Sequence, residues 1–227
     1  MKTINSFRSK LLALTLALMA GVSSFAHDFS VDGIYYNILD DNNVEVTYQG
    51  SSIYEVEYRD DVVIPDSVLY DGVNYVVASI GKNAFSYSYV KSVIIGNNVK
   101  TIGYNAISNN IFLASITMGS NVQSIGKYAF YNCSDLGAVN SLPNTLINIG
   151  ASAFRACSNL TTIHMPDNLT TIGEYAFYEC YKLASVTLGN NVTNIEGMAF
   201  MYCKALKSIT LPNITHIGGN AFNNLQL

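Results

Sequence analysis

Charged residues are scarce in this sequence, and cationic ones most of all. Only 12% of the 227 residues are charged, and removal of residues 1–26, argued below, leaves nine Lys and Arg against sixteen Asp and Glu, a formal charge of −7. Nucleic acid is therefore not expected as a partner, because its binding rests on cationic contacts to phosphate. Ser, Thr, Asn and Tyr must supply the polar surface instead, a composition that suits an extracellular contact surface.

A second long apolar run is also missing. The first one, Leu11–Gly21, is too short to cross a bilayer. Three cationic residues precede it, and Ser24 and Ala26 then place small side chains where a signal peptide is cleaved. We therefore predict a signal peptide at residues 1–26, a secreted or cell-surface protein, and no transmembrane segment after cleavage.

One short phrase, by contrast, recurs along the chain. It consists of an aliphatic residue, usually a glycine, two variable residues, Ala and a final apolar residue, and it ends at Phe85, Ile107, Phe130, Phe154, Phe177, Phe200 and Phe222. The steps between these ends are 22, 23, 24, 23, 23 and 22 residues. A period near 23 predicts a solenoid of stacked units, because one such unit cannot bury its apolar face alone. This architecture favours a binding scaffold over an enzyme.

Each unit is predicted to combine a strand with a short helix. Ile163 and Met165 lie two residues apart, which is typical of a strand with both side chains inward. After a turn and a second apolar pair, Gly173 is expected to adopt a backbone conformation that a side chain would hinder. The run Ala176-Phe-x-x-Cys-x-x-Leu183 has the spacing of a short helix with one apolar face. The predicted fold class is thus an α/β repeat solenoid.

The N-terminal residues 27–61 do not carry the repeat. Turn signals separate three β-prone runs there, at 29–31, 34–38 and 44–48. Because the first coil of a solenoid must be shielded from water, we predict that residues 27–61 form a β-rich cap and residues 62–227 the repeats. Within the first repeat, residues 70–75 are expected to form an inserted hairpin.

The repeats resemble the BspA-like leucine-rich repeats, whose pattern is close to L-x-x-I-x-L-P-x-x-V-x-x-I-G-x-x-A-F-x-x-C. Leu160–Cys180 follows this pattern, and the resemblance covers about residues 62–227, with Ile107 in place of Phe and Glu196 in place of Gly. The stretch beginning at Val31 is similar to the leader region of such proteins in Bacteroidetes. The resemblance implies a right-handed solenoid of about seven coils of 22–24 residues. It also implies surface exposure and adhesion to host proteins or other cells, and no catalytic residue.

The cysteines form a column. Each lies three residues after the Phe of its repeat, at Cys133, Cys157, Cys180 and Cys203. The favoured interpretation is a set of buried free thiols that pack as small hydrophobic groups. One or two disulfides remain an alternative, because adjacent coils lie within bridging distance. A metal site is the least favoured, because ligands in a column do not converge on one point.

No constellation of residues indicates catalysis. His164 lies at an outward strand position and His216 in a variable slot, and neither has a Ser, Cys or carboxylate at a motif spacing. The acidic pairs at 40–41 and 60–61 indicate solvated loops, with calcium binding as a minor alternative. We expect no catalytic residue, no metal and no cofactor, and therefore no enzyme.

Two surfaces are candidates for binding. The outward strand positions form a face that includes Thr117, Asn140, Thr162, His164, Thr187 and Thr210. The opposite, aromatic side carries Tyr128, Tyr131, Tyr175, Tyr178, Tyr181 and Tyr202. Small hydroxyl side chains also suit any exposed strand, whereas exposed tyrosines provide contact area at low entropy cost.

Two functions are compatible with these observations. The first is an adhesin that recognises a protein or glycan ligand on host or other cells by noncovalent contact, on family analogy. The second is a structural module of the cell envelope that self-associates through an uncapped C-terminal end, where apolar side chains and strand edges are exposed.

Overall fold

A computed structural model describes residues 27–50, 58–139 and 141–225. The predicted signal peptide at 1–26 lies outside the described residues, as does the predicted site residue Asn140. Within the described part, no helix is long and apolar enough to cross a membrane.

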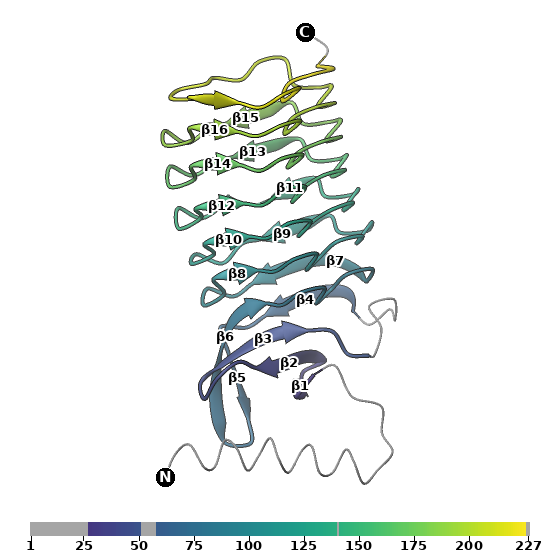
Figure 1. Ribbon diagram of the computed structural model, residues 1–227. Coiled ribbons are helices and arrows are strands. Elements are labelled where there is room, and N and C mark those ends of the chain that lie inside the picture. Colours follow the sequence, from purple (N-terminus) through teal and green to yellow (C-terminus); the bar gives the residue numbers. More distant parts are fainter. Residues whose placement is uncertain (1–26, 51–57, 140, 226–227) are drawn as a thin grey trace.

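The chain winds into an elongated stack of coils whose strands pair with those of neighbouring coils (Figure 1). One side of the stack is an eleven-stranded sheet, here called the long sheet, which is parallel from β6 to β17. The repeat solenoid predicted from the sequence period is confirmed. The long sheet contains β1 (Phe29–Val31), β2 (Ile34–Ile38), β3 (Asn43–Thr47), β5 (Ser67–Tyr70), β6 (Val73–Ile80), β8 (Thr101–Ile102), β10 (Ser124–Ile125), β12 (Asn148–Ile149), β14 (Thr171–Ile172), β16 (Asn194–Ile195) and β17 (His216–Ile217).

The other strands form two sheets, here called the short sheets. They correspond to the strands predicted from the Ile163 and Met165 spacing, and their pairing is parallel throughout. The pairing is interrupted between β11 and β13, so the face that they present is divided into two parts. One short sheet contains β4 (Arg59–Ile64), β7 (Tyr89–Ile95), β9 (Ser115–Thr117) and β11 (Ala138–Val139), and the other contains β13 (Thr162–His164) and β15 (Ser185–Thr187).

The predicted short helix is wrong, because this part of each coil is a run of turns. These runs, here called the turn side, span residues 81–88, 103–110, 126–133, 150–157, 173–180, 196–203 and 218–225. In the third run, Tyr128 and Asn132 have φ values of 60° and 57°, and a pair with the same spacing of four recurs in every run. A right-handed helix requires negative φ at every residue, so two left-handed residues per run exclude it. The α part of the predicted α/β class is therefore replaced by turns.

Backbone hydrogen bonds on the turn side alternate between local and inter-coil partners. Tyr128 N–H and Phe130 N–H donate to Ala151 O (3.0 Å) and Ala153 O (2.8 Å) of the next coil. The alternate residues Ala129 and Tyr131 donate within the turn, to Gly126 O (3.2 Å) and Tyr128 O (3.0 Å). The turns thereby satisfy their backbone groups without regular secondary structure.

The core is built from columns of identical residues. The rings of Phe130, Phe154, Phe177, Phe200 and Phe222 stack face to face, with neighbouring centroids 5.0, 5.3, 5.3 and 5.5 Å apart. All but the last of these rings are fully buried. A unit of about 23 residues thus buries its Phe only between two other units, as the period predicts.

The recurring glycines are needed for space and not for an unusual conformation. Gly150 and Gly173 do not have positive φ, so the conformational reason expected from the sequence is wrong. A Cβ atom on Gly150 would lie 2.7 Å from Lys127 N and 2.8 Å from Gly126 C of the preceding coil. The coils are in contact at this position, and a side chain would separate them.

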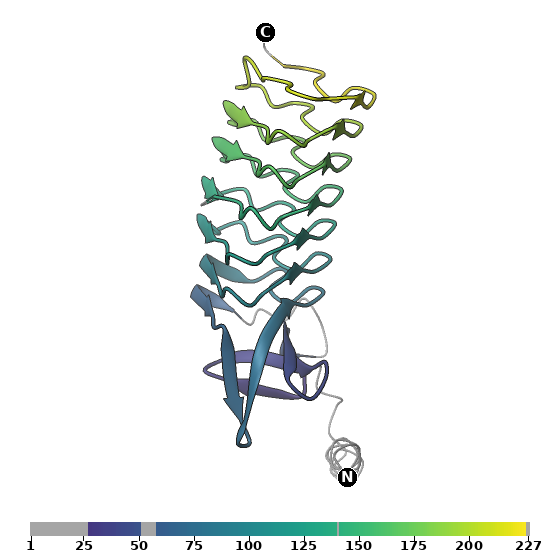
Figure 2. The ribbon, with the colours of Figure 1, turned by 90° about the vertical axis from the view of Figure 1, so that its left-hand side faces the viewer.

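The N-terminal strands form where the sequence predicts them. β1, β2 and β3 pair in antiparallel fashion, and β3 then pairs with β6 in parallel and so joins the long sheet. The expected hairpin is formed by β5 and β6 around Asp71-Gly72, and it projects past the end of the stack (Figure 2). Tyr58 links this end to the first coil, since its hydroxyl donates to Thr47 O (2.8 Å) and its ring lies 4.4 Å from that of Phe85. The boundary of the cap at residue 61 stays a prediction.

Candidate functional site

Four of the predicted strand-face residues, Thr117, Thr162, His164 and Thr187, lie on strands of the short sheets. Thr162, His164 and Thr187 are exposed, and His164 is directly opposite Thr187 in the β13–β15 register. Thr117 is exposed on β9 and faces Ile94 of β7, on the other side of the break in pairing. Thr210 is exposed beyond the last short strand, and it lines with Thr187 a shallow hollow of about 330 Å³. The structure thus groups His164, Thr187 and Thr210 and separates them from Thr117.

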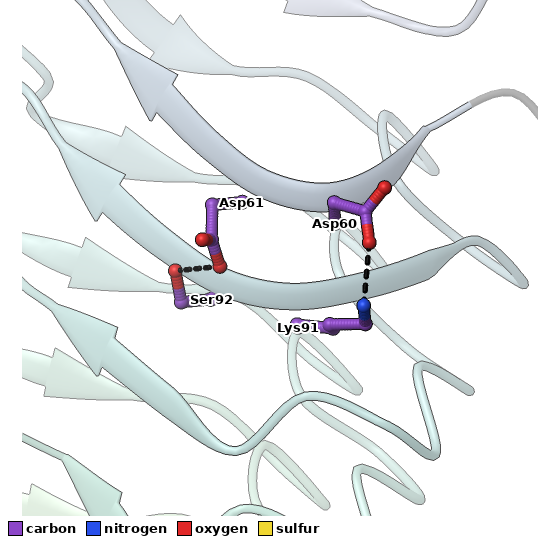
Figure 3. Close-up of polar contacts among 4 residues, drawn as sticks. All are labelled: Asp60, Asp61, Lys91 and Ser92. Atoms are coloured by element: carbon purple, nitrogen blue, oxygen red, sulfur yellow. Dashed lines mark hydrogen bonds and ion pairs between the residues drawn. The ribbon is translucent and has the colours of Figure 1, made fainter.

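The acidic pair at 60–61 is not in a loop, because both residues lie on β4 (Figure 3). Lys91 Nζ lies 2.6 Å from Asp60 Oδ1, and Ser92 Oγ donates to Asp61 Oδ1 at 2.7 Å. The hydrogen bond from Lys91 and its charge lower the pKa of the Asp60 carboxyl. These pairs are exposed to solvent, so they contribute little to stability. Within the described residues, no group of three or more His, Cys, Asp or Glu could hold a metal ion.

A larger hollow of about 800 Å³ lies at the N-terminal end of the stack. It is lined by β4 and by parts of β1, β2 and β5, and by apolar side chains such as Tyr36, Val63 and Leu69 together with Arg59 and Asp61. No sequence pattern predicted this hollow, because segments with no regular repeat spacing form most of it.

All four cysteines of the sequence are free and buried. Each thiol donates to the backbone carbonyl of the residue that occupies the Phe position one repeat earlier, as Cys157 does to Phe130 O at 3.2 Å. Burial raises the pKa of the Cys133 and Cys203 thiols to about 12. The favoured interpretation of buried thiols is confirmed, and thiols held neutral in this way are inert.

Five of the six predicted tyrosines lie on the turn side in two groups, which Arg155 joins. Ring contacts join Tyr128 to Tyr131 (5.8 Å), Tyr175 to Tyr178 (5.6 Å) and Tyr178 to Tyr202 (5.5 Å). Two members were not predicted, namely Tyr104, whose ring lies 5.8 Å from that of Tyr128, and Arg155, which lies between the two tyrosine groups. We call this set the tyrosine row, and it consists of Tyr104, Tyr128, Tyr131, Arg155, Tyr175, Tyr178 and Tyr202.

Three tyrosines of this row have a strained backbone. Tyr128, Tyr175 and Tyr202 have φ values of 60°, 57° and 64°. A left-handed conformation costs a bulky residue about 1–2 kcal/mol, whereas Asn tolerates it. Six of the equivalent positions in other coils are indeed occupied by asparagine, at Asn83, Asn105, Asn109, Asn132, Asn220 and Asn224. The repeat therefore has a less strained solution at these positions than tyrosine.

Cations lie over the tyrosine rings. The guanidinium of Arg155 is 5.8 Å from the Tyr131 centroid, 5.9 Å from that of Tyr175 and 4.8 Å from that of Tyr178. Lys127 Nζ lies 5.0 Å from the Tyr128 centroid. Burial, with a smaller contribution from the charge of Glu179, raises the pKa of the Tyr178 hydroxyl. Such a surface offers hydroxyl donors, ring faces and positive charge together.

Tyr181 is not part of the row. Its ring is 40% exposed and lies 5.2 Å from Lys204 Nζ.

The long sheet adds a second strand face that the sequence did not predict, because its two-residue strands appeared only as aliphatic pairs three residues apart. The Thr-Thr dipeptide between Leu169 and Ile172 was the available signal.

Comparison with known proteins agrees with this architecture. The family described as the BspA type leucine rich repeat region matches residues 73–141 and 138–227, with six copies. A leucine rich cell surface protein from Faecalibacterium prausnitzii is 30% identical, with a TM-score of 0.73 over 90% of this chain and 53% of its own. A leucine-rich repeat protein from Bacteroides ovatus is 27% identical, with a TM-score of 0.65 over 88% of this chain and 58% of its own. The chain thus spans between half and three fifths of these relatives.

A more distant leucine-rich repeat protein from T. pallidum is 22% identical and shares the fold, with a TM-score of 0.56 over 79% of this chain and 91% of its own. No curated protein matches the sequence. The matched residues cover most of the stack of coils described above, so this chain belongs to the BspA-type leucine-rich repeat family.

Proposed function

We propose that this chain is a secreted or surface-exposed adhesin that holds a host or cell-surface ligand on the tyrosine row by noncovalent contact. A leucine-rich repeat module of this family supports a role in protein interaction. The relative from F. prausnitzii is described as a cell surface protein, in agreement with the signal peptide predicted at residues 1–26. No turnover of the ligand is part of this proposal.

The strained tyrosines carry the proposal. Strain in the backbone tends to persist at functional sites, where surrounding structure supports it. Tyr128, Tyr175 and Tyr202 keep a bulky ring at positions where asparagine is less strained, and each of these rings contacts another tyrosine of the row. Tyrosine is enriched among the residues that dominate binding interfaces. The strand face offers mainly small hydroxyl groups, which any exposed strand carries.

The test is binding of the purified protein to an immobilised panel of extracellular-matrix and plasma glycoproteins. We expect saturable binding that falls at least about tenfold when Tyr175→Asn and Tyr178→Ala are combined, as for a central interface pair. The matched control combines His164→Ala and Thr187→Ala on the strand face, and it should bind as the unchanged protein does. The reverse pattern would place the site on the strand face and contradict the proposal.

Light scattering on the same samples tests the assembly hypothesis. Self-association through the C-terminal end stays a prediction, and it requires a mass that grows with protein concentration. A constant monomer mass together with saturable binding would favour the adhesin.

A further inference from the structure

Arg155 is a cation with no ion-pair partner in the part of the chain that the structure describes. Its side chain is half-buried, and its Nε is buried with no hydrogen-bond partner among the described residues. The ion pairs found in the described part of the chain, Lys91–Asp60 and His216–Glu196, do not involve it. The faces of three tyrosine rings provide its main compensation. A buried donor that lacks a partner in a native structure points to a group that the protein alone does not supply.

The repeat itself does not need an arginine at this position. In each coil one residue directly follows the Phe position. These residues are Ser86, Ser108, Tyr131, Arg155, Tyr178, Met201 and Asn223, so Arg155 is the one cation among them. In the first two coils the serine hydroxyls of this column contact each other at 2.8 Å, which shows how the position is satisfied without charge. The inter-coil bond at Arg155 is made by its backbone oxygen, which accepts from Asn132 N–H at 2.8 Å. The side chain is therefore available for a ligand.

We propose that Arg155, with Tyr131, Tyr175 and Tyr178, binds the carboxylate of an acidic sugar, a uronic or sialic acid, within a glycan. This inference rests on the proposed function of the tyrosine row. A guanidinium pairs with a carboxylate through two parallel hydrogen bonds. The tyrosine rings around it offer flat apolar faces for the ring of the sugar and hydroxyls for its polar groups.

The surface suits a sugar better than an acidic peptide. A peptide commonly gains affinity by adding backbone hydrogen bonds to an open strand edge. The backbone donors that point toward the next coil are already engaged here, since Phe154 N–H donates to Ala176 O and Ala156 N–H to Tyr178 O, both at 2.8 Å. Recognition must then come from side chains, and the side chains present are aromatic rings and a cation.

The distribution of charge favours an anionic ligand at this place. Residues 80–227 carry eight Lys or Arg and five Asp or Glu, whereas residues 27–79 carry one and eleven. Lys127 adds a second cation to the tyrosine row, over Tyr128. An acidic glycan is thus repelled by the N-terminal end and attracted to the repeats.

The experiment is direct titration of the purified protein with 3′-sialyllactose, an oligogalacturonate, neutral lactose and a poly-Glu peptide. We expect binding of at least one acidic saccharide, weakened by salt, and none of lactose. Arg155→Gln should weaken it at least about tenfold, and Arg155→Lys should be intermediate because the charge remains but the paired hydrogen bonds are lost. The matched control is Lys100→Gln, which removes an exposed cation directly before β8 and should change the affinity less than about twofold.

Several outcomes would overturn the inference. They are the absence of binding to every acidic saccharide, equal affinity of the Arg155→Gln protein, or a poly-Glu peptide that binds as tightly with the same dependence on Arg155. Melting temperatures of both Arg155 variants establish that they are folded. If Tyr178→Ala abolishes binding to the glycoprotein panel and Arg155→Gln does not, the proposed function stands and this inference fails. If neither variant changes panel binding, the proposed function fails as well.

Discussion

Residues 27–79 carry one Arg against eleven Asp and Glu, whereas residues 80–227 carry eight Lys and Arg against five Asp and Glu. The two regions also use aromatic side chains differently. Near the N-terminus, Phe29 packs on Tyr36 (5.3 Å) and Tyr70 (4.1 Å) in an irregular cluster from three strands. In the repeats, aromatic residues stand in columns, with Phe inside and Tyr on the turn side. The irregular cluster does not repeat along the chain, whereas a column continues from coil to coil.

The largest expected difference between the two regions is how much each contributes to the loss of stability at alkaline pH. Burial raises the pKa of the Cys133 and Cys203 thiols to about 12, against 9.0 for an unburied thiol, and raises those of Cys157 and Cys180 in the same direction. The neutral thiols stabilise the folded state fully below pH 9, and this contribution is lost as the pH rises from there towards 12. In this range each thiol lowers the free energy of unfolding by about 1.4 kcal/mol per pH unit. Tyr36, a buried tyrosine of the N-terminal strands, begins to lower the free energy of unfolding only above pH 10.0, the pKa of an unburied tyrosine.

Urea unfolding between pH 8 and 11 measures this effect. Replacement of one thiol, as in Cys157→Ala, should reduce the slope of stability against pH by about a quarter, whatever it does to stability at pH 7. A flat profile across this range would show that the thiols are not buried in solution.

Removal of a ring from the Phe column should be the most damaging single substitution. Phe154 is fully buried between Phe130 and Phe177, with centroids 5.0 and 5.3 Å away. We expect Phe154→Ala to lower the free energy of unfolding by about 3–5 kcal/mol, because it leaves a cavity between two rings. Thr187→Ala, on the exposed strand face, should change it by less than about 0.5 kcal/mol. Equal midpoints in urea for the two variants would contradict the column.

Glycine substitutions should distinguish two reasons for glycine in the two regions. Gly150→Ala is expected to cost about 1–3 kcal/mol, because its Cβ would meet the backbone of the preceding coil. Gly72 has φ +75° and open space around it, so Gly72→Ala should cost only about 1 kcal/mol, from backbone strain. Thermal unfolding of both variants gives the comparison, which fails if Gly72→Ala is the more damaging.

The smallest expected effect concerns Tyr175. Tyr175→Asn loses a ring contact of 5.6 Å with Tyr178 but relieves a left-handed tyrosine, so stability should change by less than about 1 kcal/mol. Chemical denaturation of the single variant measures this change. A loss of several kcal/mol would mean that the tyrosine row mainly supports the fold.

The columns of the core could be predicted because their members recur at one spacing. Phe154, Cys157 and Ile172 have counterparts in the same environment 22–24 residues away, so the assignment of a residue in one repeat applies to the others. The turn side was mistaken for a helix because its left-handed positions are hidden when Tyr128, Ser152 or Met198 occupies them. The asparagines at the same positions in other coils were the signal, since asparagine tolerates positive φ.

The candidate site was predicted only in part. Most of the tyrosines of the row were singled out, because aromatic residues recurred on one side of the repeat. Arg155 was missed because it occurs once in its column, and a period reveals only what recurs. Its place between Tyr131 and Tyr178 depends on the stacking of three coils, which no local pattern contains.

The direction of the hydrogen bonds on the turn side has a consequence for evolution. The N–H group at the Phe position of each coil donates to a carbonyl oxygen of the C-terminal neighbour, as Phe85 N–H does to Ala106 O. The same bond recurs along the stack, up to the one from Phe200 N–H to Ala221 O. Insertion or deletion of one whole unit therefore restores the pattern it interrupts. Chain length can then change by recombination between repeats, and longer relatives, of which this chain covers 53% and 58%, fit such a history.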